Sequence, residues 1–387
     1  MAKTKIALVV DVKNWAFDNI AKQIKTNLSH YYEIEIVYPI EDFTDFKALY
    51  SYLFSGKFAL VHFFWRTHLK NFFNYYFLKH LDVSFDRMFS TYARTVVTTS
   101  VYDHLFLTAH EVKSYLPFFQ KVVNAYTVSS QKLMKIYQNI EGGKCPDAVI
   151  QDGVDLDLFG PKKHNRVHAN AAHDLVVGWA GNSKWGKVGK DSKGLHSVIK
   201  PVLKSMRKKG FKLTEHFADR NVQFIPLEKM KDYYNEIDVY ICASDIEGTP
   251  NPVLEAMACG VPIISTDVGI VPEVFASTQK EFIFDRSQSD LEKKLTKLAH
   301  NPALRLKLAA ENLKQIVHFT RQKESEKWHK FFDVQLKAFN STASAGYLDR
   351  SAQLTSYLLD HNFFPSSRFW QWNLKNKYRF FAGISRV

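Results

Sequence analysis

The sequence predicts an α/β protein of two doubly wound domains, each with a parallel sheet covered by helices. Short apolar, β-branched runs alternate with segments of helical periodicity along the chain. With 387 residues, the chain is too long for one ordinary core. Residues 238–266 also show a strand, loop, helix, strand order, which requires parallel strands joined by a right-handed crossover.

The first half of the chain repeats strand and helix patterns. Residues 5–12 form an apolar run and lead into a segment where Trp15, Ile20, Ile24 and Leu28 keep a helical spacing. Further buried strands are predicted within residues 33–39, 58–65, 94–100, 122–130 and 147–152, with a helix after the fourth of these at residues 131–140. We predict a first domain at 1–161 and a polar, histidine-rich linker at 162–173.

The second domain is predicted at 174–320, followed by a crossing helix and a basic aromatic tail at 321–387. Its first strand ends in the glycines Gly178 and Gly181, and a helix begins near Leu195. The loop between them lies at the same sheet edge as the loop after the strand at 238–244, because parallel strands end at one edge. We interpret the linker histidines as polar linker residues and predict no metal site.

Two glutamates flank a glycine and two prolines in the stretch "DIEGTPNPVLE". Glu247 stands in the loop at the carboxyl end of a strand, whereas Glu255 stands in the first turns of a helix that starts at Pro252 with Asn251 as its cap. The N–H groups of Val253 and Leu254 would favour an anion there. Ionised carboxylates accept hydrogen bonds from hydroxyls, so the pattern indicates a nucleotide sugar as ligand. The alternative is a solvated loop acid and a partner of the helix dipole.

The stretch "EGTPNPVLEAMACGVPIISTDVGIVPE" resembles the signature of retaining glycosyltransferases of family 4, glycosyl transferases group 1, which have the GT-B fold. The resemblance implies that Glu247 contacts the donor sugar, that Glu255 contacts the ribose, and that Glu273 has a weaker role. It also implies a donor-binding segment through Gly248, Thr249, Pro250, Asn251 and Leu254.

The segments "GWAGN" and "KG" resemble the first turn of the second domain in that family. Lys193 matches the lysine that holds the donor diphosphate, and Gly181 lies in the turn. The arginine expected in this loop is missing, and Asn182 or Lys184 occupies its place. A cation would stabilise the diphosphate as its charge grows on departure. The alternative is a solvated lysine loop.

The first domain departs from the family pattern in two places. Asn14 and Trp15 stand where many members carry paired glycines, so we place them on the acceptor side. Tyr102 stands in place of the usual histidine and is also assigned to the acceptor side. Asp103 matches the family's aspartate, and His104 lies just beyond it. We assign Asp103 and His104 to the catalytic set with Glu247 and Lys193. His62 is a further histidine there, although a lone histidine on an apolar strand is more often a core residue.

These features together predict a retaining, metal-independent glycosyltransferase of the hexosyltransferase type, with no cofactor beyond its nucleotide-sugar co-substrate. Its usual setting would be bacterial envelope, capsule or lipopolysaccharide synthesis. The alternatives are an epimerase or phosphorylase of the same fold, and a non-catalytic protein that binds a nucleotide sugar or nucleic acid. Nucleic acid is disfavoured because no zinc-finger, RNP or helix-turn-helix pattern occurs. An oxidoreductase is disfavoured because no G-x-G-x-x-G follows the first strand.

The net charge of +13 and the carboxyl tail bear on location. No apolar run approaches the roughly 18–20 residues that span a bilayer, and the start lacks a signal-peptide pattern, so we expect a soluble or peripheral protein. The three cysteines, Cys145, Cys242 and Cys259, are far apart and odd in number, which predicts a reducing cytoplasm. Residues 366–387 mix basic and aromatic residues, which suits an anionic membrane surface on the inner face and a glycan or lipid-linked acceptor. The alternative is that these aromatics pack on the first domain.

Overall fold

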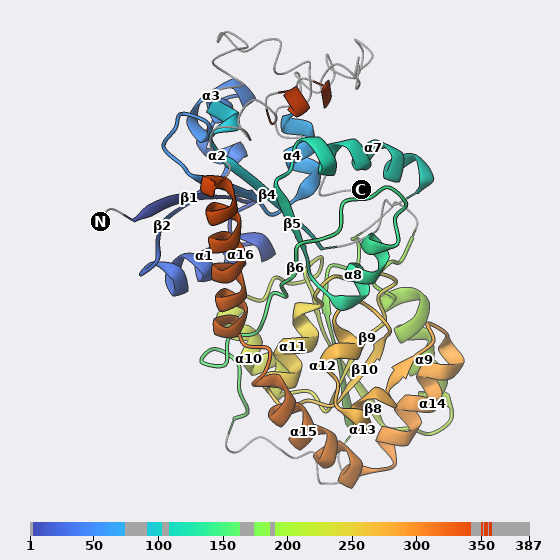
Figure 1. Cartoon of the computed structure of the whole chain (residues 1–387). Helices are drawn as coiled ribbons and strands as arrows, with labels where there is room; N and C mark the ends of the chain where they lie inside the picture. Colours follow the sequence, from blue (N-terminus) through green and yellow to red (C-terminus); the bar gives the residue numbers. More distant parts are fainter. Residues whose placement is uncertain are drawn as a thin grey trace. The chain divides into compact units, whose positions relative to one another are not determined.

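The computed structural model describes residues 3–73, 91–102, 108–162, 174–185, 190–341, 350, 352–354 and 356–357 (Figure 1). The chain forms two compact units. Unit 1 comprises the chain up to Ile150 and again from Ser325, and unit 2 comprises Gln151–Glu324. Each unit contains a parallel sheet covered by helices, so the predicted pair of doubly wound α/β domains is confirmed.

Unit 1 contains a six-stranded parallel sheet in the order β2-β1-β3-β4-β5-β6. Its strands are β1 (Thr4–Val9), β2 (Tyr32–Val37), β3 (Leu60–Phe63), β4 (Val96–Val101), β5 (Ala125–Val128) and β6 (Ala148–Val149). The helices between them are α1 (Ala16–Leu28), α2 (Pro39–Asp42), α3 (Phe46–Leu53), α4 (Arg66–Phe72), α7 (Ala109–Lys121) and α8 (Gln131–Gln138). Alternate residues of β1 enter two different apolar clusters, Ala7 and Val9 in one and Ile6 and Leu8 in the other. The sheet is therefore buried on both faces.

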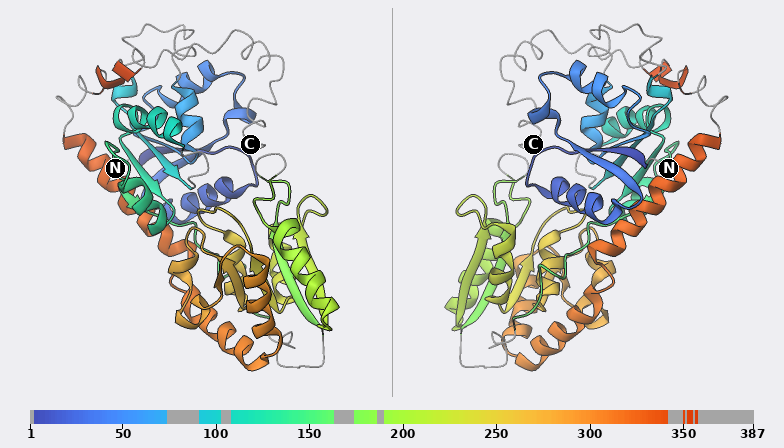
Figure 2. Two further views of the ribbon diagram at one scale, coloured as in Figure 1. Left: turned by 90° about the vertical axis from the view of Figure 1, so that its right-hand side faces the viewer. Right: turned by 90° about the vertical axis from the view of Figure 1, so that its left-hand side faces the viewer.

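Helix α16 (Arg321–Ser341) returns the chain to unit 1. Its residues Trp328, Phe331 and Phe332 are buried in the same cluster as Ile20 and Ile24 of α1. Figure 2 shows α16 crossing α1, and the side chain of Asn27 donates a 2.9 Å hydrogen bond to Ser325 Oγ. The predicted crossing helix is confirmed, and burial of its aromatic face explains why it docks there.

His62 on β3 is a buried core residue. Its Nδ1 lies 2.9 Å from Thr98 Oγ1, and its Nε2 lies 3.1 Å from Ser100 Oγ. Ser100 Oγ in turn lies 2.8 Å from Thr127 Oγ1, and the Trp328 ring packs edge-on against the imidazole. Burial lowers the pKa of His62 to about 3, so the ring is neutral at physiological pH. This supports the core interpretation of His62 rather than a catalytic one.

Substitution of His62 by leucine should destabilise unit 1. Leucine is apolar and would leave the Thr98 and Ser100 hydroxyls with one partner fewer in the interior, at a cost of about 1–3 kcal/mol. Urea unfolding should show this loss, whereas leucine at the exposed His110 should change the unfolding free energy little. Equal effects of the two substitutions would contradict a structural hydrogen-bond role for His62.

Unit 2 contains a five-stranded parallel sheet in the order β11-β10-β9-β7-β8. Its strands are β7 (Leu175–Gly181), β8 (Leu213–Asp219), β9 (Val239–Cys242), β10 (Ile263–Thr266) and β11 (Ile283–Phe284). Helical segments are η2 (Leu195–Ile199), α9 (Lys200–Lys208), α10 (Leu227–Asn235), α11 (Asn251–Ala258), α12 (Val271–Val274), α13 (Ser277–Lys280), α14 (Gln288–Ala299) and α15 (Pro302–Ile316). Apolar clusters on both faces bury the sheet, as in unit 1.

The chain enters unit 2 earlier than the predicted domain end at residue 161. Phe159 is 1% exposed and lies in a core cluster of unit 2. Val154 forms a parallel bridge with Thr320, so residues 151–161 belong to unit 2. Only Lys162 of the predicted linker 162–173 lies within the described residues.

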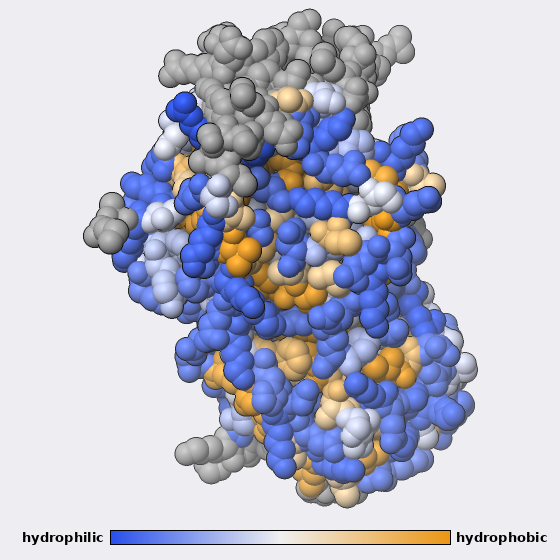
Figure 3. All heavy atoms as spheres, in the orientation of Figure 1, coloured by the Kyte–Doolittle hydropathy of each residue, from blue (hydrophilic) through white to orange (hydrophobic). Residues whose placement is uncertain are grey.

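The described surface is mainly hydrophilic on the face shown in Figure 3, with apolar side chains in separate patches. Within the described ranges, no helix combines the length and apolar character needed to cross a membrane. The predicted membrane-surface segment at 366–387 lies outside the described residues and stays a prediction.

Candidate active site

Lys193 and Glu247 lie together at the carboxyl edge of the sheet in unit 2. Lys193 Nζ forms an ion pair with Glu247 Oε1, and the two side chains are 17% and 16% exposed. Ser244 Oγ donates a 2.7 Å hydrogen bond to the same carboxylate oxygen. Lys193 Nζ also lies 4.6 Å from the centre of the Trp185 ring. Two residues that the sequence assigned to catalysis, 54 positions apart, are therefore in direct contact.

Two glycines allow the loops of this edge to approach closely. Gly194 has φ +71°, and a Cβ there would lie 2.4 Å from Ala243 O at the end of β9. Gly269 has φ +47°, and a Cβ there would lie 1.9 Å from Gly248 O. The N–H of Ile270 donates to the same carbonyl at 3.1 Å. Any side chain at these two positions would displace the loops that carry Lys193 and Glu247.

Helix α11 begins one residue earlier than predicted. Its N-cap is Pro250, and Asn251 is the first helical residue rather than the cap. Because Asn251 is already helical, its side chain cannot cap the helix; its Nδ2 instead donates to Asp152 Oδ2 at 3.1 Å. The N–H of Val253 donates to Pro250 O at 2.8 Å. The prediction that this N–H faces an anion is therefore wrong.

Glu255 on α11 is held by a tyrosine from α10. Tyr234 Oη donates a 2.7 Å hydrogen bond to Glu255 Oε2. Burial raises the pKa of Glu255, while the Tyr234 bond and the charge of Arg321 act in the opposite direction. The bond fixes the orientation of the carboxylate. Sequence reasoning missed Tyr234, because no local pattern links it to a glutamate 21 positions later.

Asp152 is buried and accepts a hydrogen bond from Asn251, the first residue of α11. Its Oδ1 is buried with no hydrogen-bond partner, and burial raises its pKa to about 7. The neighbouring Gln151 donates from its backbone to Glu324 Oε2 and from its side chain to Glu273 Oε2, both at 3.0 Å. Glu273 thus contacts the segment where the chain enters unit 2.

Asn182 has a structural role in the loop after β7. Its Oδ1 accepts hydrogen bonds from Lys184 N at 3.0 Å and from Asn221 Nδ2 at 2.6 Å. The backbone N–H of Arg220 donates to Gly181 O at 2.9 Å, which ties this loop to the one after β8. Lys184 itself is exposed.

Arg286, after β11, is a second residue that sequence reasoning missed. Its guanidinium forms an ion pair with Asp245 at 2.8 Å and donates to Ala243 O at 2.7 Å. It therefore binds segments that precede Glu247 in the chain. Nothing in the local sequence "FDRSQ" signals this role, because the partners come from a different strand.

In unit 1, the acceptor-side candidates follow β1 and β4. Asn14 is a non-glycine residue with φ +61°. Its N–H donates to Asp18 Oδ2 at 2.7 Å, which supports this strained conformation. The Tyr102 ring lies 4.9 Å from the Phe17 ring. Trp15 is the N-cap position of α1.

The catalytic candidates Asp103 and His104 lie outside the described residues, and their role stays a prediction.

Sequence reasoning also missed Asp11, just after β1. Burial raises its pKa to about 6, and its Oδ1 is buried with no hydrogen-bond partner.

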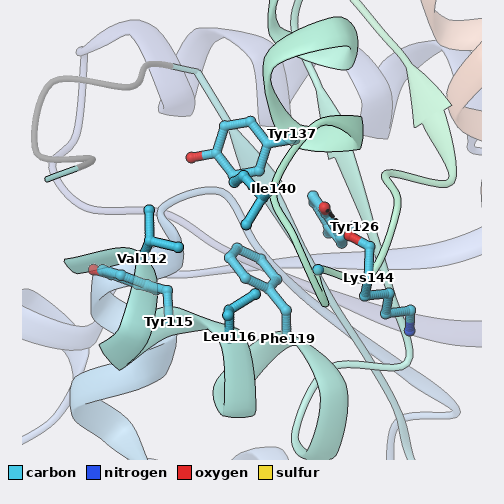
Figure 4. A pocket seen from close by; sticks show the side chains of 9 residues that line it. Val112, Tyr115, Leu116, Phe119, Tyr126, Tyr137, Ile140 and Lys144 are labelled. Atoms are coloured by element: carbon cyan, nitrogen blue, oxygen red, sulfur yellow. Dashed lines mark hydrogen bonds between the residues drawn. The ribbon is translucent and has the colours of Figure 1, made fainter. Parts of the chain in front are cut away.

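A separate hollow lies in unit 1 against α7, β5 and α8 (Figure 4). Its wall is mainly apolar and aromatic, from residues such as Leu116, Phe119, Tyr137 and Ile140. Lys144 is its one charged lining residue, and its Nζ donates to the Val123 carbonyl at 3.1 Å. This lining offers packing surface rather than groups suited to a diphosphate.

Comparison with known proteins identifies similar proteins for part of the sequence and for the whole fold. Residues 209–315 match the family described as glycosyl transferases group 1. TuaC of Bacillus subtilis, named as a teichuronic acid biosynthesis glycosyltransferase, is 36% identical over 76 residues, which is 20% of each chain. AmsK of Erwinia amylovora, an amylovoran biosynthesis glycosyltransferase, is 37% identical over 59 residues, which is 14% of each chain. The matches thus span a fifth or less of these relatives.

Solved structures resemble almost the whole chain. Sucrose-phosphate synthase from Thermosynechococcus elongatus has a TM-score of 0.63 at 13% identity and covers 87% of this chain and 100% of its own. HepE from Anabaena, solved in complex with UDP and glucose, has a TM-score of 0.59 at 13% identity and covers 85% of this chain and 99% of its own. These likenesses confirm the predicted GT-B fold.

Proposed function

We propose that the protein is a glycosyltransferase that moves a sugar from a nucleoside diphosphate donor to an acceptor hydroxyl with retention and without a metal. The contact between Lys193 and Glu247 at the carboxyl edge of the unit 2 sheet carries this proposal. Open α/β sheets bind ligands at this edge. The group 1 match over residues 209–315 supports it, as does the polysaccharide biosynthesis named for TuaC and AmsK.

Each residue of the site has a role that suits its chemistry. The Lys193 ammonium stabilises the diphosphate, whose negative charge grows as the bond to the sugar breaks. Glu247 accepts hydrogen bonds from hydroxyls of the transferred sugar, and Glu255 accepts them from the ribose. Gly248, Thr249, Pro250 and Leu254 line the donor segment between these two glutamates.

Retention follows from front-face attack in this proposal. Retaining glycosidases use a second carboxylate as nucleophile, about 5–5.5 Å from the first. The Glu247 carboxylate instead contacts Lys193 and Ser244, which suits a fixed hydrogen-bond acceptor better than a nucleophile. The acceptor hydroxyl therefore attacks from the side of the leaving group, and a phosphate oxygen of the donor takes its proton.

The acceptor is a glycan or a lipid-linked glycan of a bacterial envelope, capsule or lipopolysaccharide in this proposal. Asn14, Trp15 and Tyr102 contribute to its binding. The enzyme acts in the cytoplasm, at the inner face of the membrane when its basic aromatic tail binds anionic lipid. Reported complexes of HepE with UDP-glucose support a nucleotide-sugar donor for this fold.

Thermal stabilisation by nucleotide sugars tests the proposal. A ligand that binds only the folded protein raises stability by RT ln(1 + [L]/Kd), so one donor at about 100 Kd adds about 2.7 kcal/mol. We expect a uridine, guanosine or adenosine diphosphate sugar to raise the Tm, and sugar transfer to require an acceptor. Epimerised sugar without acceptor, phosphate-dependent cleavage, or no binding by any donor would contradict it.

Substitution of Tyr234 by phenylalanine should weaken nucleoside diphosphate binding without removing it. The lost hydrogen bond to Glu255 is expected to cost about 0.5–1.5 kcal/mol, or roughly two- to twelvefold in Kd. Glu255→Ala should weaken binding further, because it removes the group that contacts the ribose. Isothermal titration with the nucleoside diphosphate measures both effects.

Tyr240→Phe is the matched control, since Tyr240 is also buried but donates to Ala180 O at 3.2 Å. It should alter stability but not Kd. Equal Kd values for Tyr234→Phe and the unaltered protein would show that Tyr234 does not orient a ligand-binding glutamate.

A further inference from the structure

Arg286 connects three segments at the carboxyl edge of the unit 2 sheet. Its Nε donates to Ala243 O at 2.7 Å, its Nη1 pairs with Asp245 Oδ1 at 2.8 Å, and its Nη2 donates to Asp191 O. The Arg286 and Asp245 side chains are only 26% and 19% exposed. Since β11 is the edge strand and β10 separates it from β9, the arginine reaches across the end of β10.

Two of these partners, Asp191 and Asp245, precede the two residues of the ion pair by two positions each. Asp191 stands before Lys193, and Asp245 stands before Glu247. The two loops are also tied to each other, because Asp245 N donates to Ser192 O at 2.9 Å. The Asp191 carbonyl that accepts from Arg286 also accepts from Gly194 N at 3.1 Å. The Arg286 guanidinium therefore holds both the loop that carries Lys193 and the loop that carries Glu247.

We propose that Arg286 is the positioning residue that holds the loops of Lys193 and Glu247 in place for donor binding and transfer; this inference rests on the proposed function. The planar guanidinium presents five N–H donors in a fixed fork, and three of its nitrogens are used here in three directions. A lysine at this position has one nitrogen on a flexible stem and cannot reproduce that geometry. Lys190 also pairs with Asp245 at 3.1 Å, but its side chain is 60% exposed, so this second ion pair holds Asp245 less firmly than Arg286 does.

Direct binding of the donor phosphate by Arg286 is the less suitable role. All three of its nitrogens already contact protein oxygens, and a phosphate would have to displace Asp245 or a backbone carbonyl. The arginine missing from the loop after β7 is therefore not replaced in function by Arg286. Its effect on the donor passes through the loops.

The test compares Arg286→Lys and Arg286→Ala with Arg207→Ala. Arg207 forms a similar fork at the opposite end of the sheet, with Nε donating to Leu213 O at 3.1 Å and Nη1 pairing with Glu215 at 2.7 Å. Four quantities are measured for each variant: the Tm, the kcat of sugar transfer, the donor KM, and amide hydrogen exchange in residues 190–195 and 243–249.

Both Arg286 variants should lose on the order of ten- to a hundredfold in kcat/KM, because displaced loops misplace the groups that bind the donor. Amide exchange should accelerate in both loops. Millimolar guanidinium should restore part of the activity of Arg286→Ala but none of that of Lys193→Ala. Arg207→Ala should lower the Tm but change neither kcat/KM nor the amide exchange of the two loops.

Equal kinetic losses in Arg286→Lys and Arg207→Ala, or full activity of Arg286→Lys, would overturn the inference. Unchanged amide exchange in both loops would overturn it as well. If the unaltered protein transfers no sugar, the proposed function fails, and the exchange measurement still decides whether Arg286 holds the loops.

Discussion

Substitution of Glu247 by glutamine is expected to lower kcat of sugar transfer by roughly a hundredfold or more, while nucleoside diphosphate binding persists. Hydrogen bonds to sugar hydroxyls that strengthen in the transition state contribute several kcal/mol in enzymes that act on glycosides. Glutamine keeps the size of the side chain but removes the negative charge that strengthens these hydrogen bonds. Glu247 also pairs with Lys193, so the phosphate competes with this carboxylate for the ammonium. The Kd of the nucleoside diphosphate should therefore stay the same or fall.

Glu292 offers a matched control for this substitution. It pairs with Lys209, the C-cap of α9, and accepts a hydrogen bond at 3.3 Å from Ser205 Oγ on the same helix. Glu292 therefore has a lysine and a serine partner, as Glu247 does. Glu292→Gln should leave kcat unchanged. Steady-state kinetics and titration calorimetry on both variants measure the effect. A Glu247→Gln enzyme with the unaltered kcat would remove Glu247 from the catalytic set.

Substitution of Asp152 by asparagine is expected to stabilise the protein at pH 8 and to have little effect near pH 4. Burial raises the pKa of Asp152 from 3.8 to about 7 in the folded protein. Between these pH values the folded state keeps a proton that the unfolded state has released, so the unfolding free energy falls as pH rises. Above pH 7 the whole cost of the buried charge is present. Asparagine carries no charge and still accepts from Asn251, so we expect a gain on the order of 1–4 kcal/mol at pH 8.

Chemical denaturation at pH 4, 6 and 8 measures this effect. Asp219→Asn provides a comparison of opposite sign, because hydrogen bonds from Ser183 and Asn221 lower the pKa of Asp219 despite its burial. That variant should lose stability at neutral pH. A stability of Asp152→Asn that is no higher than that of the unaltered protein at pH 8 would show that Asp152 is not a buried, strained charge.

Local sequence patterns predicted the strands of the unit 1 sheet and the segments that carry the site, but in unit 2 they predicted β7, β9 and β10 and not β8 or β11. The alternation of apolar runs with helical spacing places β1, β9 and β10 correctly, and the return of α16 follows from its aromatic face. Parallel strands end at one edge, so the proximity of the loops with Lys193 and Glu247 was also predictable. The direct ion pair between them could not be predicted, because it depends on the geometry of the two side chains.

The parts that were not predictable depend on partners distant in sequence. The cap of α11 was misassigned because Asn251 forms its bond with Asp152, 99 positions earlier, rather than with its own helix. Arg286 and Tyr234 carry no motif, since their roles arise only when neighbouring strands and helices assemble. The burial of Asp152 likewise comes from the fold and has no local sequence signal.

The split of unit 1 between two parts of the chain has a consequence for synthesis on the ribosome. Unit 2 is complete once Glu324 has been made, whereas unit 1 still lacks Trp328, Phe331 and Phe332, which cover Ile20 and Ile24. Unit 1 is translated first but completes its core last. Its apolar surface stays uncovered while more than 170 further residues are synthesised. A released chain truncated after Glu324 should therefore bind chaperones through the uncovered apolar surface of unit 1, while its unit 2 resists protease.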